Sequence, residues 1–189
     1  MFGELPQTVE VSNVARKIRT DYRDIINILV AQSDPNLDND EKIYICLFIF
    51  YIDFDEIKED EYNEAFQKAL NFIDAGLKSS NTPGPRLMDW EHDEAIICSA
   101  VNKVAGTDVR KERYIHWWTF LGYYLEINDS FFSQVVSIRK KRATGKKLET
   151  YEQEFYRSNK NLIRLKEKLS DEEEQIRKEE KERLNQLIH

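Results

Sequence analysis

The chain has 189 residues, 41% of them hydrophobic and 33% charged, with a formal net charge of -7. This length suits one globular domain with a charged extension. The negative charge argues against a nucleic-acid binder, which needs clustered cations. Six glycines and four prolines are few for the turns of a β-sandwich. The apolar run at residues 43–52 is about half as long as a membrane span, so no membrane association is expected.

The cysteines and the N-terminus indicate a cytoplasmic protein. Cys46 and Cys98 are isolated, so we expect no disulfide framework and a reducing compartment. The first residues lack the basic and apolar segments of a secretion signal.

The N-terminal segment predicts a β-hairpin followed by a helix. Val9 and Val11 alternate with polar residues, and Ser12-Asn13 is suitable turn chemistry. A lone hairpin is marginally stable in water, so it must pack on helices. Thr20 is the expected N-cap of the first helix. The apolar face of that helix consists of Tyr22, Ile25, Ile26 and Leu29.

Two further helices are expected next. Asp38 and Glu41 have the spacing of a capping box. Residues 43–52 could form a buried strand, but the cap favours a helix that is buried on all sides. A third helix stops near Gly76. Its helical pattern consists of Tyr62, Ala65, Phe66, Ala69, Leu70 and Ile73. Residues 78–85 form a loop on composition alone.

Three more helices complete the predicted domain. Asp89 caps a fourth helix that runs to Gly106, the fifth spans residues 113–125, and Ser130 caps a sixth that ends near Arg142. The predicted fold class is therefore all-α, a compact domain of about six helices with a small N-terminal β-hairpin.

The composition changes after the sixth helix, which divides the chain into a globular domain (residues 1–142) and a charged helical extension (residues 143–189). Apolar residues still recur there with heptad spacing, at Leu148, Tyr151, Phe155, Leu162, Leu165 and Leu169. They predict a short coiled coil, a helix that docks on a partner, or a helix folded back on its own domain. Residues 171–181 are nearly all charged and predict a solvated helix. We expect deletion of residues 146–189 to leave the domain folded.

Three polar side chains fall on or beside apolar helix faces. Asp93 shares a stripe with Ile97, Arg139 lies beside Val135, and His116 begins a His-Trp-Trp segment. A buried carboxylate needs a cation or several hydrogen-bond donors. The sequence therefore predicts a buried polar cluster of Asp93, His116 and Arg139 that fixes how the helices pack.

Two other interpretations of these residues remain open. Asp93 could orient His116 for general acid–base catalysis, although no nucleophile or second base accompanies them. A metal site is the other interpretation, although no recognised zinc pattern is present. Its ligands would be Asp89, His92, Asp93 and His116. We expect a non-enzymatic protein without metal or cofactor, and an acid–base enzyme or metal protein is the alternative.

Aromatic residues surround the fifth predicted helix. Trp118 and Leu121 share the spacing of its core side. Trp117 and Tyr124 lie on the other edge, where they are either core residues or an exposed patch that binds a partner.

Several motifs occur in a fairly specific order over roughly residues 1–142. They are Leu5-Pro6, Ile18 to Arg23, Asp34, Glu41-Lys42, Asp89 to Asp93, His116 to Phe120, and Ile138-Arg139. In this order the chain resembles the gene-product-fifteen family of bacteriophages, whose members are small tail-module proteins of siphophages from Gram-positive hosts.

The resemblance implies a function in tail morphogenesis. Genes of that family lie close to the tape-measure gene, which implies a tail-assembly chaperone that binds the tape-measure protein in the host cytoplasm. Binding to the tail-tube protein and formation of a homo-oligomer are left open. The resemblance supplies no catalytic residues. A prophage-encoded regulator that acts through its C-terminal helix is a further alternative.

Overall fold

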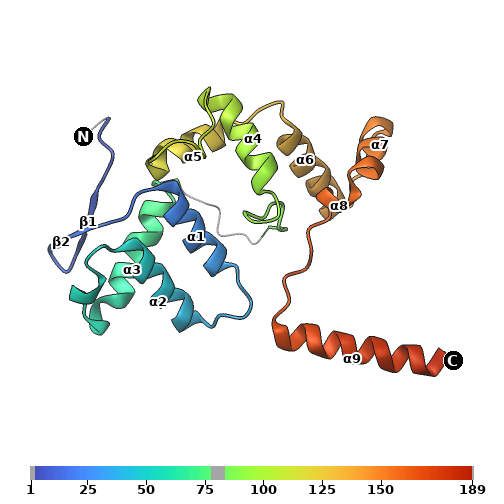
Figure 1. The fold of residues 1–189 in the computed structure, drawn as a ribbon, viewed down its shortest axis with the longest axis horizontal. Helices are drawn as coiled ribbons and strands as arrows, with labels where there is room; N and C mark the ends of the chain where they lie inside the picture. Colours follow the sequence, from blue (N-terminus) through green and yellow to red (C-terminus); the bar gives the residue numbers. More distant parts are fainter. Residues whose placement is uncertain (1–2, 78–83, 189) are drawn as a thin grey trace.

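The computed structural model describes residues 3–77 and 84–188, and these ranges are mostly helical with one two-stranded sheet (Figure 1). The predicted all-α class with a small hairpin is confirmed. The described ranges contain nine α-helices rather than about six, because three more follow residue 143. None of these helices is long and apolar enough to cross a membrane. The loop predicted at residues 78–85 falls largely on 78–83, which lie outside the described residues.

The N-terminal hairpin consists of β1 (Thr8–Val11) and β2 (Val14–Lys17), which pair antiparallel. The turn residues Ser12 and Asn13 have φ of 50° and 63°, the left-handed conformation that a two-residue hairpin turn requires. Ser12 also donates from its backbone N–H and its hydroxyl to the carboxylate of Glu64, at 3.1 and 3.0 Å. The hairpin therefore rests on the helix that carries Glu64, as its marginal stability requires.

Helix α1 (Tyr22–Gln32) is capped by Asp21, whose carboxylate accepts the backbone N–H of Arg23 at 2.9 Å. The prediction that Thr20 caps this helix is wrong. The Thr20 hydroxyl instead forms a hydrogen bond of 2.6 Å with the hydroxyl of Tyr114. The start of α1 is thereby tied to a segment 94 residues further along the chain.

Helix α2 (Asn39–Phe50) begins with the predicted capping box, in which Asp38 and Glu41 exchange hydrogen bonds of 2.8 and 2.9 Å. The prediction that this helix is buried on all sides is wrong. Tyr44 and Phe48 are 51% and 57% exposed, because the neighbouring helices cover only part of its surface. Helix α2 therefore presents aromatic rings to solvent.

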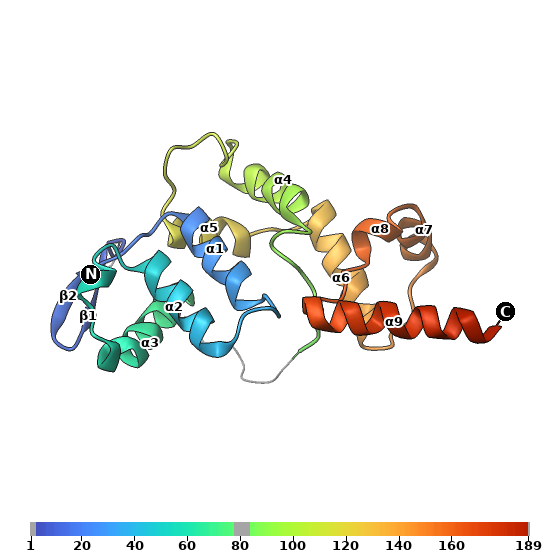
Figure 2. The same cartoon turned by 60° about the horizontal axis from the view of Figure 1, so that its bottom comes forward.

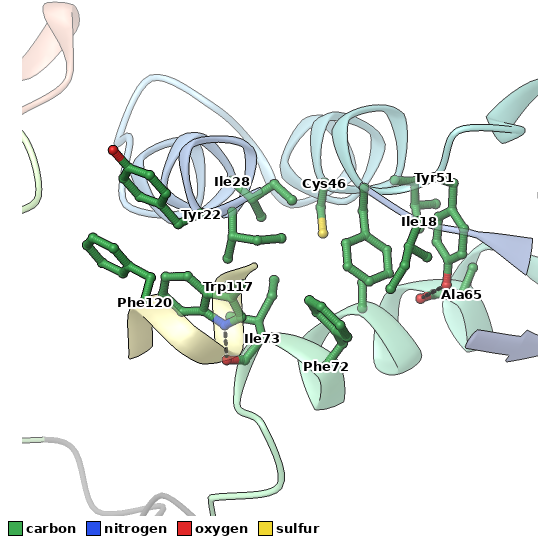
Figure 3. Packing of buried hydrophobic residues seen from close by; sticks show 14 of the residues in the cluster. Ile18, Tyr22, Ile28, Cys46, Tyr51, Ala65, Phe72, Ile73, Trp117 and Phe120 are labelled. Carbon is green, nitrogen blue, oxygen red and sulfur yellow. Dashed lines mark hydrogen bonds between the residues drawn. The ribbon is translucent and has the colours of Figure 1, made fainter. Parts of the chain in front are cut away.

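The main core lies between α1, α2, α3 (Tyr62–Ile73) and α5 (Trp117–Leu125), as the close view of its side chains shows (Figure 3). Two short 3-10 helices, η1 (Phe54–Glu56) and η2 (Glu59–Glu61), connect α2 to α3. The largest fully buried side chains are Trp117, Tyr51, Phe50 and Phe120. The high aromatic content of the chain is thus used mainly in this core.

Two helices begin later than the sequence predicts. Helix α4 (Glu94–Ala105) is preceded directly by Asp93 rather than by Asp89. Asp89 organises the turn before it, where its carboxylate accepts the N–H of His92 at 2.7 Å. Helix α5 begins four residues later than predicted and has His116 as its N-cap.

Helix α6 (Phe131–Ala143) is capped by Ser130 as predicted, and α7 (Thr150–Ser158) and α8 (Lys160–Ile163) fold back on it. The prediction of one continuous heptad-patterned helix is wrong, because the helix is interrupted between α7 and α8 and again after α8. A second core forms here from Val135, Ile138 and Ile163, with Leu148, Phe155, Tyr156 and Leu162 packed against them. The predicted domain boundary after residue 142 would separate α6 from α7 and α8, although these three helices share the second core.

Helix α9 (Asp171–Ile188) extends away from the rest of the chain in Figure 1, and Figure 2 shows its first turns in front of α6 and its C-terminal end projecting beyond α7. The side chains of residues 171–183 are all exposed, as the charged composition predicts. Near its start the backbone N–H of Asp171 donates to the side-chain oxygen of Asn36 at 2.8 Å. The helix is therefore fixed at its N-terminal end, and its side chains from there to residue 183 face solvent.

We predict that a chain ending at residue 145 is less stable than the full chain by about 4 kcal/mol. Such a chain lacks Ile163 and uncovers Ile138, which are 2% and 0% exposed in the complete protein. This reverses the sequence-based expectation for deletion of residues 146–189. A chain ending at residue 170 is the control, and its urea unfolding midpoint should stay near that of the full chain. Equal midpoints for the two truncations would contradict the prediction.

Candidate functional site

Arg139 on α6 is the centre of a buried polar cluster and is 6% exposed. Its guanidinium donates two hydrogen bonds to the carboxylate of Asp93, at 2.6 and 2.8 Å. The other N–H groups donate to three backbone carbonyls, those of Leu87 at 3.0 Å, Leu162 at 2.8 Å and Ile163 at 2.8 Å. All five guanidinium donors are therefore used.

The carboxylate of Asp93 is equally well satisfied. Asp93 is 0% exposed, and besides the guanidinium it accepts the backbone N–H of Asp89 at 3.0 Å. It makes no capping bond to α4, although it occupies the N-cap position, because its oxygens turn towards Arg139. Burial of both charges is tolerated because they form a bidentate pair with further hydrogen bonds.

His116 does not belong to this cluster, so that part of the prediction is wrong. At the start of α5 its Nδ1 accepts the backbone N–H of Trp118 at 3.1 Å. Its Nε2 therefore carries the proton and donates to the carbonyl of Pro6 at 3.0 Å. Both ring nitrogens are occupied there, because the late start of α5 makes His116 a helix cap.

A second charged cluster surrounds Asp89, which is 6% exposed. Arg86 and Lys168 form ion pairs with it, the latter at 3.1 Å. Burial alone would raise the pKa of the Asp89 carboxyl, but the hydrogen bond from His92 and the two cations lower this pKa to about 2. The ring Nε2 of His92 forms a hydrogen bond of 2.8 Å with the carbonyl of Leu162. Asp89 thus ties the segment before α4 to the segment before α9.

These contacts give the metal and acid–base alternatives no support. The carboxylates of Asp89 and Asp93 face cations, and His116 is engaged elsewhere. No group of three potential metal ligands occurs in the part of the chain that the structure describes. Burial raises the pKa of the Cys46 thiol to about 12 and also raises that of Cys98, so neither is an activated thiolate. The contacts of these buried groups join segments of the chain to one another.

Trp117 and Tyr124, the first candidate surface for a partner, belong largely to the protein interior. Trp117 is 2% exposed, and its indole N–H donates to the carbonyl of Ile73 at 2.8 Å (Figure 3). Tyr124 packs between Trp90 and Phe132, and burial raises its pKa. The interpretation of this edge as an exposed patch is therefore wrong for Trp117, which is a core residue.

The second candidate surface, the heptad residues after α6, is only partly accessible. Leu148, Phe155 and Leu162 pack into the second core, and Leu165 and Leu169 are half-buried. Tyr151 alone of this set is strongly exposed, at 62%. Whether any of these residues binds a partner stays a prediction.

The sequence interpretation missed an exposed aromatic surface on α2. The rings of Tyr44 and Phe48 stack with centroids 6.3 Å apart and both contact Phe54. Beside Tyr44, a hollow of about 780 Å³ is lined by residues that include Asp40, Glu59 and Tyr62. The signal was present in the sequence, since residues 43–52 are apolar around the whole helix while a surface helix needs only one apolar face.

The fold and the site define a small helical protein. Its buried charges pair with one another and hold segments of the chain together, and a partner can reach only its exposed surfaces. Residues 1–165 match the family described as Bacteriophage Gp15 protein, and the chain belongs to that family. The matched range includes α7 and α8, which agrees with their packing on α6. Searches of curated proteins and of solved structures found no match.

We predict that Asp93→Ala destabilises the protein by about 3–5 kcal/mol, because it leaves the buried guanidinium without its counter-charge. Arg139→Lys should also be strongly destabilising, since an ammonium group cannot supply five donors in a planar fork. Urea unfolding monitored by tryptophan fluorescence measures both. The matched control is Arg110→Lys, which alters an exposed pair with Asp108 and should leave the midpoint nearly unchanged. A normal midpoint for Asp93→Ala would contradict the structural role of the pair.

A pH dependence follows from Asp89. Its pKa is lowered from 3.8 to about 2, so the ionised carboxylate stabilises the folded state by about 2 kcal/mol above pH 4. That contribution is lost as the pH falls towards 2. The difference in free energy of unfolding between the parent and Asp89→Asn should therefore shrink by about this amount between pH 6 and pH 2. A difference that stays constant over this range would show that Asp89 has an ordinary pKa.

Proposed function

We propose that this chain is a non-enzymatic bacteriophage tail-assembly protein, which acts in the host cytoplasm as a chaperone for the tape-measure protein. Membership of the phage family supports a structural or assembly role. The saturated polar cluster supports binding rather than catalysis. The structural observation that carries the proposal is α9, a long helix that projects from the domain.

Helix α9 has the properties of a segment that is completed by a partner. Residues 171–183 are exposed throughout, so little packing within the chain stabilises this helix. Ile176 is 52% exposed, and its spacing to Leu184 and Leu187 fits one apolar stripe of an α-helix. A long helical protein such as a tape measure can cover that stripe by helix–helix packing. We therefore place the binding role on α9 rather than on the heptad residues at 148–169, which are partly buried within the chain.

Co-expression tests the proposal. The full chain, carrying an affinity tag, should co-purify with the tape-measure protein of the same phage. Ile176→Glu should weaken this complex, because it places a charge on the apolar stripe. Lys178→Glu is the matched control, since it introduces the same residue on another face of the helix and should leave binding intact. Circular dichroism would establish that both variants keep their helices.

Two outcomes would contradict the proposal. If the folded full chain does not co-purify with the tape-measure protein, the chaperone function is wrong. If a chain ending at residue 170 binds as well as the full chain, α9 is not the binding element. The tail-tube protein is a second partner to include in the same co-expression, because it assembles around the tape measure.

A further inference from the structure

Charge is distributed very unevenly along this chain. Residues 38–64 contain ten Asp and Glu but two Lys, whereas residues 139–168 contain eleven Lys and Arg but four Glu. The first range includes α2 and the start of α3, and the second includes α7 and α8. These two groups of helices lie at opposite ends of the molecule in both views (Figures 1 and 2). The lysines between α6 and α7 are therefore too far from the acidic residues of α2 to pair with them within one copy.

Part of the acidic charge is neutralised locally, and part is not. Arg16 lies close to the carboxylates of Asp53, Glu56 and Glu61, at 3.1 to 3.9 Å. Four further acidic residues are exposed and form no ion pair within the described ranges: Asp40, Asp55, Glu59 and Asp60. We call these four residues, together with the exposed rings of Tyr44 and Phe48, the acidic surface.

The acidic surface is also hollowed. Asp40 and Glu59 both line the hollow of about 780 Å³, and so does the ring of Tyr44. Free carboxylates beside aromatic rings suit a ligand that presents lysine or arginine next to an apolar side chain. Cations can lie over the rings as well as pair with the carboxylates.

The opposite end of the molecule presents that chemistry. Lys141 is used internally, since it pairs with Glu152 at 2.7 Å. Lys140, Lys146 and Lys147 are exposed and form no ion pair among the residues described. Tyr151 follows them in the first turn of α7 and is 62% exposed. We call Lys140, Lys146, Lys147 and Tyr151 the basic surface.

We propose that the basic surface of one copy binds to the acidic surface of a second copy. The lysines would pair with Asp40, Asp55 and Glu59, and the ring of Tyr151 would pack against Tyr44 and Phe48. The two surfaces are different and lie at opposite ends of the molecule, so the contact is heterologous. In a pair, one copy keeps a free acidic surface and the other keeps a free basic surface. Association therefore continues head to tail into a ring or a linear array.

This self-association goes beyond the proposed tape-measure binding and uses other residues than α9. It can be tested on the purified full chain alone, so its failure is distinguishable from failure of the chaperone function. Because the contact depends on exposed charges, it is expected to be strongest at low salt, where screening is weakest.

Two charge-reversed variants of the full chain provide the test. The first carries Asp40→Lys, Asp55→Lys and Glu59→Lys, and the second carries Lys140→Glu, Lys146→Glu and Lys147→Glu. In sedimentation velocity at low salt, the parent should form species larger than a monomer that dissociate at high salt. Each variant alone should remain monomeric, because both of its surfaces then carry the same sign of charge. An equimolar mixture of the two should associate again.

The matched control carries Glu172→Lys, Glu174→Lys and Glu179→Lys on α9, which changes as many charges outside both surfaces. It should associate like the parent. Thermal unfolding of each variant would verify that it is folded. A parent that is monomeric at low salt, a reversed variant that still self-associates, or a mixture that stays monomeric would each overturn the proposal.

Discussion

The guanidinium of Arg139 can be buried only if five acceptors converge on it, and this requirement organises the C-terminal half of the fold. Its acceptors come from the segment before α4, from Asp93 at the start of α4, and from the last residues of α8. Replacing a buried ion pair by apolar residues is often neutral or stabilising, so the pair is better understood as selecting one arrangement than as adding stability. An alternative packing of α8 would leave two or more donors unpaired in the interior, at a high free-energy cost. The carbonyls of Leu162 and Ile163 therefore make α8 part of the domain, and the family match, which ends at residue 165, includes it.

The sequence predicts two of the three residues assigned to this cluster correctly, for a sound physical reason. Asp93 and Arg139 both fall among apolar residues of amphipathic segments, and two opposite charges on buried faces must find each other. His116 met the same criterion and was misassigned, because its role depends on where α5 begins. A shift of four residues turned a side chain expected on the helix into the cap that precedes it. The heptad pattern after α6 failed for a related reason. Spacing reports which residues are apolar, but a break in the helix at Asn159 lets Phe155 on α7 and Leu162 on α8 pack from two short helices instead of one long one.

The sequence pattern of α2 predicts more burial than the structure has, because hydrophobicity alone does not show how much of a helix its neighbours can cover. Residues 43–50 of α2 are all apolar, which is more than one helix can bury against two neighbours, so the rings of Tyr44 and Phe48 face solvent. Exposed aromatic rings of this kind are a common feature of binding surfaces. The buried polar atoms around Arg139 and Asp89 are already paired. The proposed interactions therefore use three exposed features: the surface of α2, the lysines between α6 and α7, and the projecting helix α9.

Two of these features have opposite charge and lie at opposite ends of the molecule, and this geometry favours a particular kind of assembly. A two-fold dimer whose axis passes through either surface would place that surface against itself, so like charges would face each other and repel. A head-to-tail contact pairs unlike charges and gives the assembly a direction. A tape-measure protein is also a directional object, being a chain with two different ends. Copies joined head to tail would carry their α9 helices at regular intervals and in one orientation, which is the arrangement needed to cover a long helical partner evenly.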